Sequence, residues 1–211
     1  MIGRDLQLQQ SKAPIAYPKV LVVEGHDAFQ FFKALLRHLN LLSEIEIRNS
    51  GGVNNWPVYL KTLIGTPGFV DVISLGVIRD AEDDMTAAFA SVSNGLRQAQ
   101  LSVPEQPLAI AAGKPKVSIF ILPDCVSSGM LETLCLRAVS SDPVMPCVDD
   151  YFQCLQKQNH PSSANLPKAR LHAFLASRQK PDLLLGQAAH ASYWPWDNPT
   201  FDSLKQFLRA L

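Results

Sequence analysis

Acidic side chains follow the apolar segments of this 211-residue chain, and their positions give the first indication of chemistry. Glu24 comes directly after one apolar run, Asp80 and Glu82 follow another, and Glu132 lies early in an expected helix. The carboxyl ends of parallel strands share one edge of a sheet, where ligands bind, so we expect these side chains to meet in one crevice. The acidic residues near this expected crevice are Glu24, Asp27, Asp80, Glu82, Asp83, Asp84, Asp124 and Glu132.

Carboxylates that are held close together repel one another, and a hard divalent cation removes that repulsion. Mg²⁺ prefers oxygen ligands and usually takes one or two carboxylates per ion, together with water and substrate phosphate. Two such ions about 4 Å apart can clamp the attacking and leaving oxygens of a phosphodiester. The pattern therefore predicts a site for Mg²⁺ or Mn²⁺, with one or two ions.

Helix capping is the competing explanation for several of these residues, because acidic side chains at a helix N-terminus satisfy free amides. The residues for which capping is favoured, when each is taken alone, are Asp27, Asp83 and Asp84. Glu24 and Asp80 each end an apolar strand before a helix, so we favour a metal role for both. Asp124 fits equally well with a turn that begins after Pro123.

Apolar periodicity predicts the elements that would position these side chains. Continuous or alternating apolar runs predict strands at 19–23, 45–47, 72–78, 108–111 and 117–122. Helical spacing predicts helices at 27–39, 53–64, 85–99, 130–138, 144–157, 166–177 and 201–211, with Asp27 as a cap of the first. This order predicts an α/β fold, with a mainly parallel sheet, helices on both faces and a helical C-terminal extension. The expected segments are a flexible N-terminal stretch (1–16), the α/β core (17–125) and the extension packed on the core (126–211).

Composition restricts the partners that we expect. Nineteen basic and nineteen acidic residues give zero net charge, so binding of DNA or RNA would need a local basic patch. Candidates for such a patch, or for an ordinary solvated face, are Lys114, Lys116, Lys168, Arg170, Arg178 and Lys180. Charged residues make up only 18% of the chain, and this low share favours self-association as a homo-oligomer. The aromatic segment 193–197 could stack on bases, although packing of the C-terminal helices explains it better.

Localisation follows from segments that the sequence lacks. No apolar run approaches the length of about 18 residues that a membrane helix needs, so we expect no membrane association. The first twelve residues have no hydrophobic core of the kind that a secretion signal carries. The four cysteines form no C-x-x-C pair and are expected to be reduced thiols. A cytoplasmic protein is the expectation.

Two short motifs resemble those of a known domain. The segments Val22-Val23-Glu24-Gly25-His26-Asp27 and Gly76-Val77-Ile78-Arg79-Asp80-Ala81-Glu82-Asp83-Asp84 resemble the Toprim (topoisomerase–primase) domain, with a glutamate after the first strand and a D-x-D after the third. With Leu122-Pro123-Asp124 and Gly129-Met130-Leu131-Glu132, the pattern is similar to an uncharacterised prokaryotic family of Toprim-like proteins. It also resembles the metal-site pattern of overcoming-lysogenisation-defect nucleases. The Toprim similarity covers about residues 19 to 125.

The resemblance implies roles for the acidic residues. Glu24 would be a metal ligand or general acid/base, Asp80 a metal ligand, and Asp27 and Glu132 ligands of a second ion. Glu82 replaces the second aspartate of D-x-D, so its contact with metal would shift or pass through water. Additional members of the site would be Asp84, Asp124 and His26. His26 stands where lysine is frequent, either as a phosphate contact or as a solvent-facing residue at the start of a helix.

These observations predict divalent-metal-dependent phosphoryl transfer on nucleic acid, with phosphodiester cleavage as the leading reaction and with Glu24 and Asp80 as catalytic residues. The alternative is a non-catalytic module that binds a nucleotide or nucleic acid within a larger defence or repair assembly. A third hypothesis is a metal–nucleotide site of glycosyltransferase type, which also uses a D-x-D after a strand but has no place for the Glu24 loop.

Overall fold

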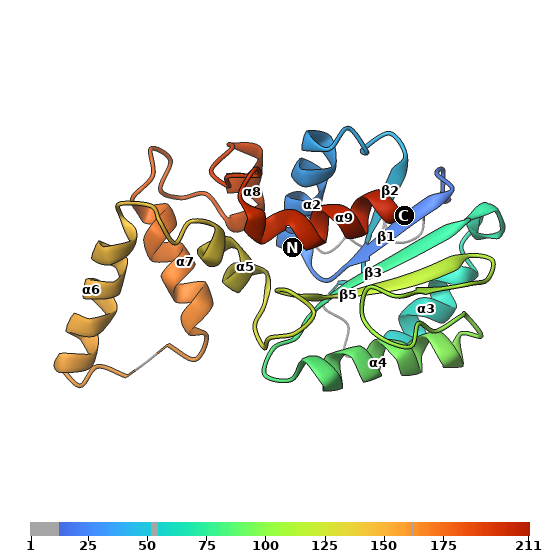
Figure 1. Ribbon diagram of the computed structural model, residues 1–211, viewed down its shortest axis with the longest axis horizontal. Helices are drawn as coiled ribbons and strands as arrows, with labels where there is room; N and C mark the ends of the chain where they lie inside the picture. The colour runs from blue at the N-terminus through green and yellow to red at the C-terminus, as the bar shows by residue number, and fades with distance from the viewer. Residues whose placement is uncertain (1–12, 52–54, 162) are drawn as a thin grey trace.

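The structure is a computed structural model, and it describes residues 13–51, 55–161 and 163–211 (Figure 1). Its strands are β1 (Lys19–Val23), β2 (Ile45–Asn49), β3 (Ser74–Asp80), β4 (Ile110–Ala111) and β5 (Lys116–Leu122). Its helices are α2 (His26–His38), α3 (Trp56–Ile64), α4 (Met85–Gln98), α5 (Leu131–Ala138), α6 (Met145–Lys157), α7 (Leu166–Ala176), α8 (Leu185–His190) and α9 (Asp202–Ala210). Two 3-10 turns complete the order, η1 (Phe69–Asp71) and η2 (Pro199–Phe201).

The strands form one sheet in the order β2-β1-β3-β5-β4. Strands β2, β1, β3 and β5 run parallel to one another, and among the described strands only the short β4 is antiparallel, alongside β5. The central strands are apolar along almost their whole length because helices cover them from both sides. The predicted α/β fold with a mainly parallel sheet is confirmed.

Helices cover both faces of the sheet, as predicted. On one face, the core includes side chains of α2, α5 and α9 packed against Leu21 and Phe120. On the other face, the core includes side chains of α3 and α4 packed against Val22 and Ile119. Figure 1 shows α3 and α4 below the sheet and α2, α8 and α9 above it. These two layers are called the α3–α4 face and the α2–α5 face below.

The C-terminal extension returns to the sheet after α6 and α7, which lie beyond its end (Figure 1). A Cβ at Gly76 of β3 would stand only 2.8 Å from Leu211, so the absent side chain leaves room for the chain end. The short helix α8 is not among the predicted elements. It packs against α2, and a Cβ at Gly186 would lie 2.5 Å from the carbonyl oxygen of Asp27.

Several element boundaries differ from the sequence-based expectation. The strand expected at 72–78 is shifted to 74–80, and the strand expected at 108–111 is reduced to two residues. The helix expected at 53–64 begins at Trp56 with Pro57 in its first turn, whereas residues 53 and 54 lie outside the described ranges. Among the residues described, no helix is long and apolar enough to cross a membrane.

The predicted flexible segment 1–16 is described only from residue 13 onward. There the chain is anchored: the Ile15 side chain is buried, and its backbone N–H donates to the Pro67 carbonyl at 2.8 Å. Arg48 donates to the carbonyl oxygens of Ala13 and Pro14. Ile15 and Arg48 therefore attach residues 13–16 to the core, although residues 13, 14 and 16 are themselves exposed, and residues 1–12 lie outside the described ranges.

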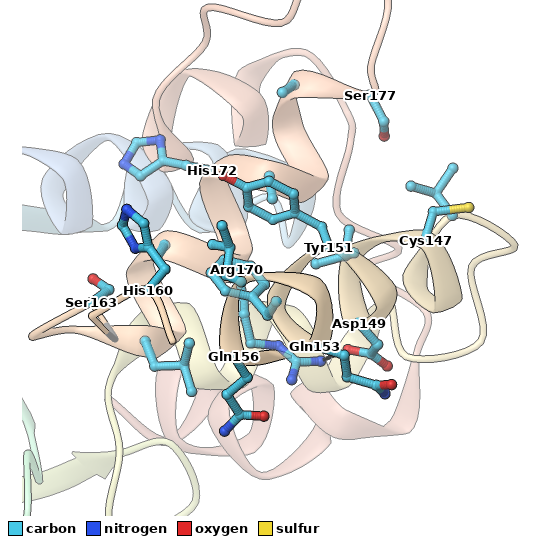
Figure 2. A pocket seen from close by; sticks show the side chains of 18 of the residues that line it. Cys147, Asp149, Tyr151, Gln153, Gln156, His160, Ser163, Arg170, His172 and Ser177 are labelled. Atoms are coloured by element: carbon cyan, nitrogen blue, oxygen red, sulfur yellow. Dashed lines mark hydrogen bonds and ion pairs between the residues drawn. The ribbon is translucent and has the colours of Figure 1, made fainter. Parts of the chain in front are cut away.

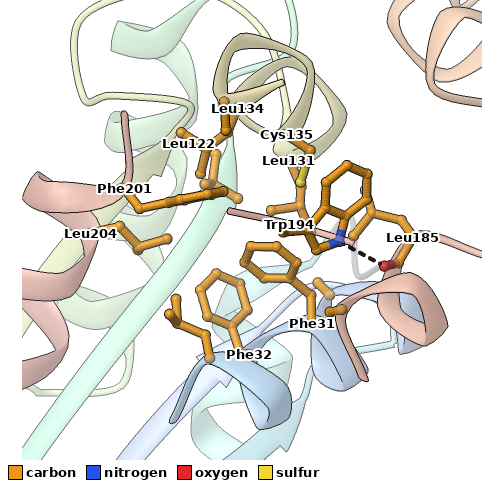
Figure 3. Close-up of a cluster of buried hydrophobic side chains, with 14 of the residues drawn as sticks. Phe31, Phe32, Leu122, Leu131, Leu134, Cys135, Leu185, Trp194, Phe201 and Leu204 are labelled. Atoms are coloured by element: carbon orange, nitrogen blue, oxygen red, sulfur yellow. Dashed lines mark hydrogen bonds between the residues drawn. The ribbon is translucent and has the colours of Figure 1, made fainter. Parts of the chain in front are cut away.

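The aromatic segment near the C-terminus is part of the core on the α2–α5 face (Figure 3). Trp194 is buried, and its indole N–H donates to the carbonyl oxygen of Leu185 at 3.1 Å. The Trp196 ring lies 5.2 Å from the Phe31 ring in an edge-to-face arrangement. Packing of the C-terminal helices, the explanation favoured from the sequence, accounts for both tryptophans.

Candidate functional site

Glu24 and Asp80 leave the carboxyl edge of the sheet toward opposite faces. Side chains alternate along a strand. Val23 packs on the α2–α5 face, so its neighbour Glu24 projects toward the α3–α4 face. Ile78 also packs on the α2–α5 face, and Asp80, two residues later in the same strand, projects to that face. The carboxyl edge was expected to bring the acidic side chains into one crevice, but Glu24 and Asp80 lie on different faces of the sheet there.

Asp80 caps the helix that begins across the edge from it. Its Oδ1 accepts the backbone N–H of Leu131, the first residue of α5, at 2.9 Å. Burial raises the pKa of Asp80 to about 7, and the negative charges of Glu132, Glu82 and Glu24 add to that effect. The Leu131 hydrogen bond opposes the rise in pKa, since it stabilises the ionised form. Asp80 thus lies directly beside Glu132 in an environment that disfavours its charge.

A backbone bridge holds the loop after β3 against the loop before α5. Glu82 and Gly129 exchange two hydrogen bonds, of 2.9 Å and 2.7 Å. Glu82 has a left-handed φ of 52°, which is uncommon for a residue with a side chain. Gly129 has a φ of 131°, and a Cβ there would lie 2.8 Å from the Thr133 hydroxyl. Gly129 therefore positions the site, although the only local sign of this role in the sequence is a glycine just before a predicted helix.

Glu132 connects the acidic edge to α7. Burial raises the pKa of Glu132; its own backbone N–H and the ammonium group of Lys168 lower it, and Asp27 and Glu82 raise it further. Lys168 is exposed near the start of α7. Glu132 therefore lies among acidic groups from α2 and the β3 loop, with one cation near it.

Glu24 lies on the opposite side of the edge. Burial raises the pKa of Glu24, while the Arg79 guanidinium lowers it and Glu82 raises it. The turn that presents Glu24 is fixed by Asn49, whose Oδ1 accepts the N–H of Gly25 at 2.9 Å and that of Gly51 at 2.8 Å. The strand expected at 45–47 extends to Asn49, and this last residue of β2 anchors the β1–α2 loop.

Asp27 has a structural role that differs from the predicted one. The first turn of α2 contains Asp27, but the cap residue of this helix is Gly25 and no side chain caps it, so the predicted cap is wrong. The Asp27 Oδ1 instead accepts the backbone N–H of Gly186 in α8, at 3.0 Å. Electrostatic contact with Glu132 still places Asp27 at the acidic edge on the α2–α5 face.

Of the three additional candidates, Asp84 and Asp124 accept hydrogen bonds from the protein itself, and His26 faces the solvent. Asp84 is the N-cap of α4 and accepts the N–H of Ala87 at 3.0 Å, which confirms the capping explanation. Asp124 accepts the backbone N–H groups of Val126 and Ser127, the Ser127 hydroxyl and the Arg137 guanidinium. Although burial acts in the other direction, these bonds lower the pKa of Asp124 to about 2. His26 is exposed at the first position of α2, the second of the two alternatives considered for it.

The acidic edge supplies hard oxygen ligands, but its carboxylates do not make a complete coordination shell for a metal ion. Among the described residues, no three histidine, cysteine, aspartate or glutamate side chains come close enough together to hold a metal ion. Mg²⁺ rarely uses an all-protein cage and takes one or two carboxylates with water and substrate phosphate. Asp80 and Glu132 fit that mode, because they are adjacent and the Oδ2 of Asp80 has no hydrogen-bond donor in the part of the chain described.

The basic residues considered from the sequence do not form one patch. Lys114 and Lys116 lie at the amino end of β5, the opposite end of the sheet from Asp80. Arg170 is paired with Asp149, and Arg178 with Asp142 at 3.0 Å. Lys168 is the member of this set that acts on the acidic edge.

A groove lies between α6 and α7 (Figure 2). Apolar side chains such as Tyr151 and Phe152 line it, together with His160 and His172. None of the predicted metal ligands lines it; its acidic residue is Asp149, the partner of Arg170. It is therefore separate from the carboxyl edge of the sheet.

Comparison with known families matches residues 18–211 to a family described as "Protein of unknown function (DUF3226)". Comparisons with curated proteins and with solved structures gave no match.

Proposed function

The chain belongs to the DUF3226 family, and from the geometry of its sheet edge we propose that it is a Toprim-like enzyme that cleaves phosphodiester bonds in nucleic acid with Mg²⁺ or Mn²⁺. Asp80 and Glu132 would hold the ion on the α2–α5 face, with Asp27 and Glu82 contributing from either side. Glu24 would act from the α3–α4 face.

The hydrogen bond between Asp80 and Leu131 is the observation that carries this proposal. It fixes the last residue of β3 against the start of α5 and so brings Asp80 next to Glu132, 52 positions further along the chain. Two adjacent carboxylates in a partly buried setting destabilise each other unless a positive charge is present. Burial is the main cause of the raised pKa values of both groups, and neighbouring carboxylates raise them further: Glu132 acts on Asp80, and Asp27 and Glu82 act on Glu132.

A bound divalent cation would polarise a phosphoryl oxygen and supply an activated water for attack. The protein's own contribution is positional. The Glu82–Gly129 bridge holds the two ligand-bearing loops together, and the Leu131 N–H fixes the orientation of the Asp80 carboxylate. Burial raises the pKa of Glu24, and this direction favours the protonated carboxyl that a general acid for the leaving oxygen requires.

Two cationic side chains near this edge favour a phosphate-bearing substrate. Lys168 acts on Glu132 from α7, and Arg79 acts on Glu24 from β3. The chain has zero net charge, so it has no excess of positive charge to attract a polyanion. Lys168 and Arg79 can each attract a phosphate group locally. Together they provide a cation on each side of the carboxylates.

One observation favours the alternative of a non-catalytic binding module. Within the described ranges the carboxylates do not form a group of three metal ligands, whereas a cleaving site with two ions needs more ligands than Asp80 and Glu132 supply. In that case the edge would hold a single ion or nucleotide and perform no cleavage.

Incubation of the protein with supercoiled plasmid and with labelled single-stranded RNA, in Mg²⁺, Mn²⁺ or EDTA, tests the proposal. We expect cleavage that is faster with Mn²⁺, because Glu82 in place of aspartate loosens the geometry and Mg²⁺ tolerates departures from octahedral coordination poorly. Asp80→Asn and Glu132→Gln should each slow cleavage about 100-fold, the effect of about 2.7 kcal/mol in the barrier.

Asp83→Asn is the matched control, since Asp83 is an exposed carboxylate in the same loop. It should cleave at the wild-type rate. Intact plasmid and RNA with both metals would exclude the nuclease and leave the binding module. Equal losses in Asp83→Asn and Asp80→Asn would show that only the total charge of the loop matters.

A further inference from the structure

We infer that Arg79 binds a phosphate group of the nucleic acid on the α3–α4 face of the sheet edge, opposite Asp80 and Glu132. The inference rests on the proposed function only for the class of substrate. It adds a phosphate subsite that uses none of the expected metal ligands on the α2–α5 face.

The register of the sheet places Arg79 in a polar row. Strands β1 and β2 pair through Val23 and Asn49, and strands β1 and β3 pair through Val22 and Val77. The N–H of the residue after Asn49 still donates to the Val23 carbonyl, at 2.9 Å, so this pairing continues past the strand end. Continued by one residue, the β1–β2 register places Glu24 opposite Ser50. Continued by two residues, the β1–β3 register places Glu24 opposite Arg79, so these side chains are neighbours on the α3–α4 face. The row consists of Ser50, Glu24 and Arg79.

Arg79 lies near Glu24 and Trp56, but among the described residues it has no hydrogen-bond or ion-pair partner, unlike Arg170 and Arg178. Its Nη1 is buried and has no hydrogen-bond acceptor, and the side chain makes no ion pair with any carboxylate in the described ranges. By contrast, Arg170 pairs with Asp149 and Arg178 with Asp142. A buried donor without an acceptor costs free energy that an incoming acceptor recovers, so an unpaired guanidinium at a ligand-binding edge indicates a ligand.

The surroundings of Arg79 define the chemistry of that ligand. The guanidinium carbon lies over the Trp56 ring, 6.0 Å from its centre, at the outer limit of a cation–π interaction. The Trp56 indole N–H and the Ser50 hydroxyl are both buried and both lack a hydrogen-bond partner. Three groups that can donate, one of them positively charged, match an anion with several oxygen acceptors. A planar guanidinium recognises phosphate through paired hydrogen bonds.

Strand alternation explains why this subsite is separate from the carboxylates. Arg79 and Asp80 are consecutive residues of β3 and therefore point to opposite faces. A nucleic-acid strand that crosses the sheet edge can place one phosphate near Asp80 and another near Arg79. Arg79 would then determine how far the strand extends past the carboxylates, with Trp56 as a positioning residue.

Binding of short fluorescein-labelled single-stranded DNA and RNA, measured by anisotropy in EDTA at several salt concentrations, tests this inference. Arg79→Gln should weaken binding about tenfold or more and reduce the salt slope by about 0.7, the value for one lost phosphate contact on a single strand. Arg79→Lys should recover part of the affinity, since it keeps the charge but not the fork. The matched control is Arg97→Gln, an exposed arginine of α4, which should bind as the wild type does.

Both labelled probes are phosphodiesters, and preference for one of them identifies the natural polymer. An unchanged dissociation constant and salt slope in Arg79→Gln overturns the inference, as does a wild type that binds neither probe. If Arg79→Gln melts below the assay temperature, Arg79→Lys decides: affinity and slope equal to those of the wild type would mean that charge alone matters and that no guanidinium subsite exists. The binding assay contains no metal, so its result does not depend on catalysis. Absence of cleavage in the separate assay with Mg²⁺ or Mn²⁺ would refute the proposed function and leave Arg79-dependent binding intact.

Discussion

Replacement of Asp80 by asparagine separates a metal ligand from a structural acceptor. The asparagine removes one charge at nearly unchanged volume and keeps an oxygen that can accept the N–H of Leu131. Burial first, and then Glu132, raise the pKa of Asp80 from 3.8 to about 7. A carboxyl whose folded pKa is raised contributes stability that is fully present below about pH 3.8 and is lost as the pH rises through about 7.

The size of that loss follows from the pKa difference. A rise of about three pKa units, at about 1.4 kcal/mol each, makes the ionised side chain about 4 kcal/mol less favourable to the folded state at pH 8. Asparagine avoids this loss and remains a neutral acceptor for the Leu131 N–H, whose effect on the ionised carboxylate is already contained in the pKa of Asp80. In EDTA at pH 8 we therefore expect Asp80→Asn to be more stable by about 4 kcal/mol, a rise of roughly 8–16 °C in melting temperature.

Thermal melts of both proteins in EDTA between pH 4 and pH 8.5 provide the measurement. The wild type should lose stability relative to the variant across this range, and most of the difference should disappear near pH 4. Metal at about a hundred times its dissociation constant should stabilise the wild type by about 2.7 kcal/mol at pH 8 and the variant by little. If Asp80→Asn melts well below the wild type in EDTA at pH 8, the carboxylate is a structural acceptor for α5, and the metal site loses its central residue.

Three further substitutions test how the site is held, each by urea unfolding against the wild type. Gly129→Ala should destabilise the protein by about 1–3 kcal/mol, because φ is 131° and the new Cβ would approach Thr133; an unchanged midpoint would show that the loop relaxes freely. Asp27→Ala should cost about 1 kcal/mol through the lost bond to the Gly186 N–H, and Asp27→Asn less; equal effects of both would contradict this. Asp124→Asn should cost about 1 kcal/mol at pH 7, after allowance for solvent screening, and the cost should shrink as the pH falls from about 4 toward 2; a loss independent of pH would argue against the lowered pKa.

Local sequence patterns predicted the sheet and most helices, because apolar runs and helical spacing report burial directly. The same patterns could not reveal which acidic residue caps which helix. Asp27 was expected to cap its own helix, but its partner is Gly186, 159 positions away, in a helix too short and too weakly periodic to be predicted. The partners of Asp124, by contrast, are local. Its hydrogen bonds with Val126 and Ser127 form the turn that Pro123-Asp124 indicates in the sequence.

The separation of Glu24 and Asp80 onto different faces depends on where β3 ends. Hydrophobicity alone places the end of this strand two residues too early. The apolar run stops at Ile78, so the following residues read as a loop whose side chains could all turn toward one crevice. Hydrogen bonding to β5 continues through Asp80, opposite Leu122, and keeps the strand alternation for two more residues. That extension sends Arg79 to the face with Glu24 and Asp80 to the face with α5. An acidic crevice alone would repel a polyanion, whereas in the proposed site a donor on one face and carboxylates on the other would allow one strand end to bind both a phosphate and a cation.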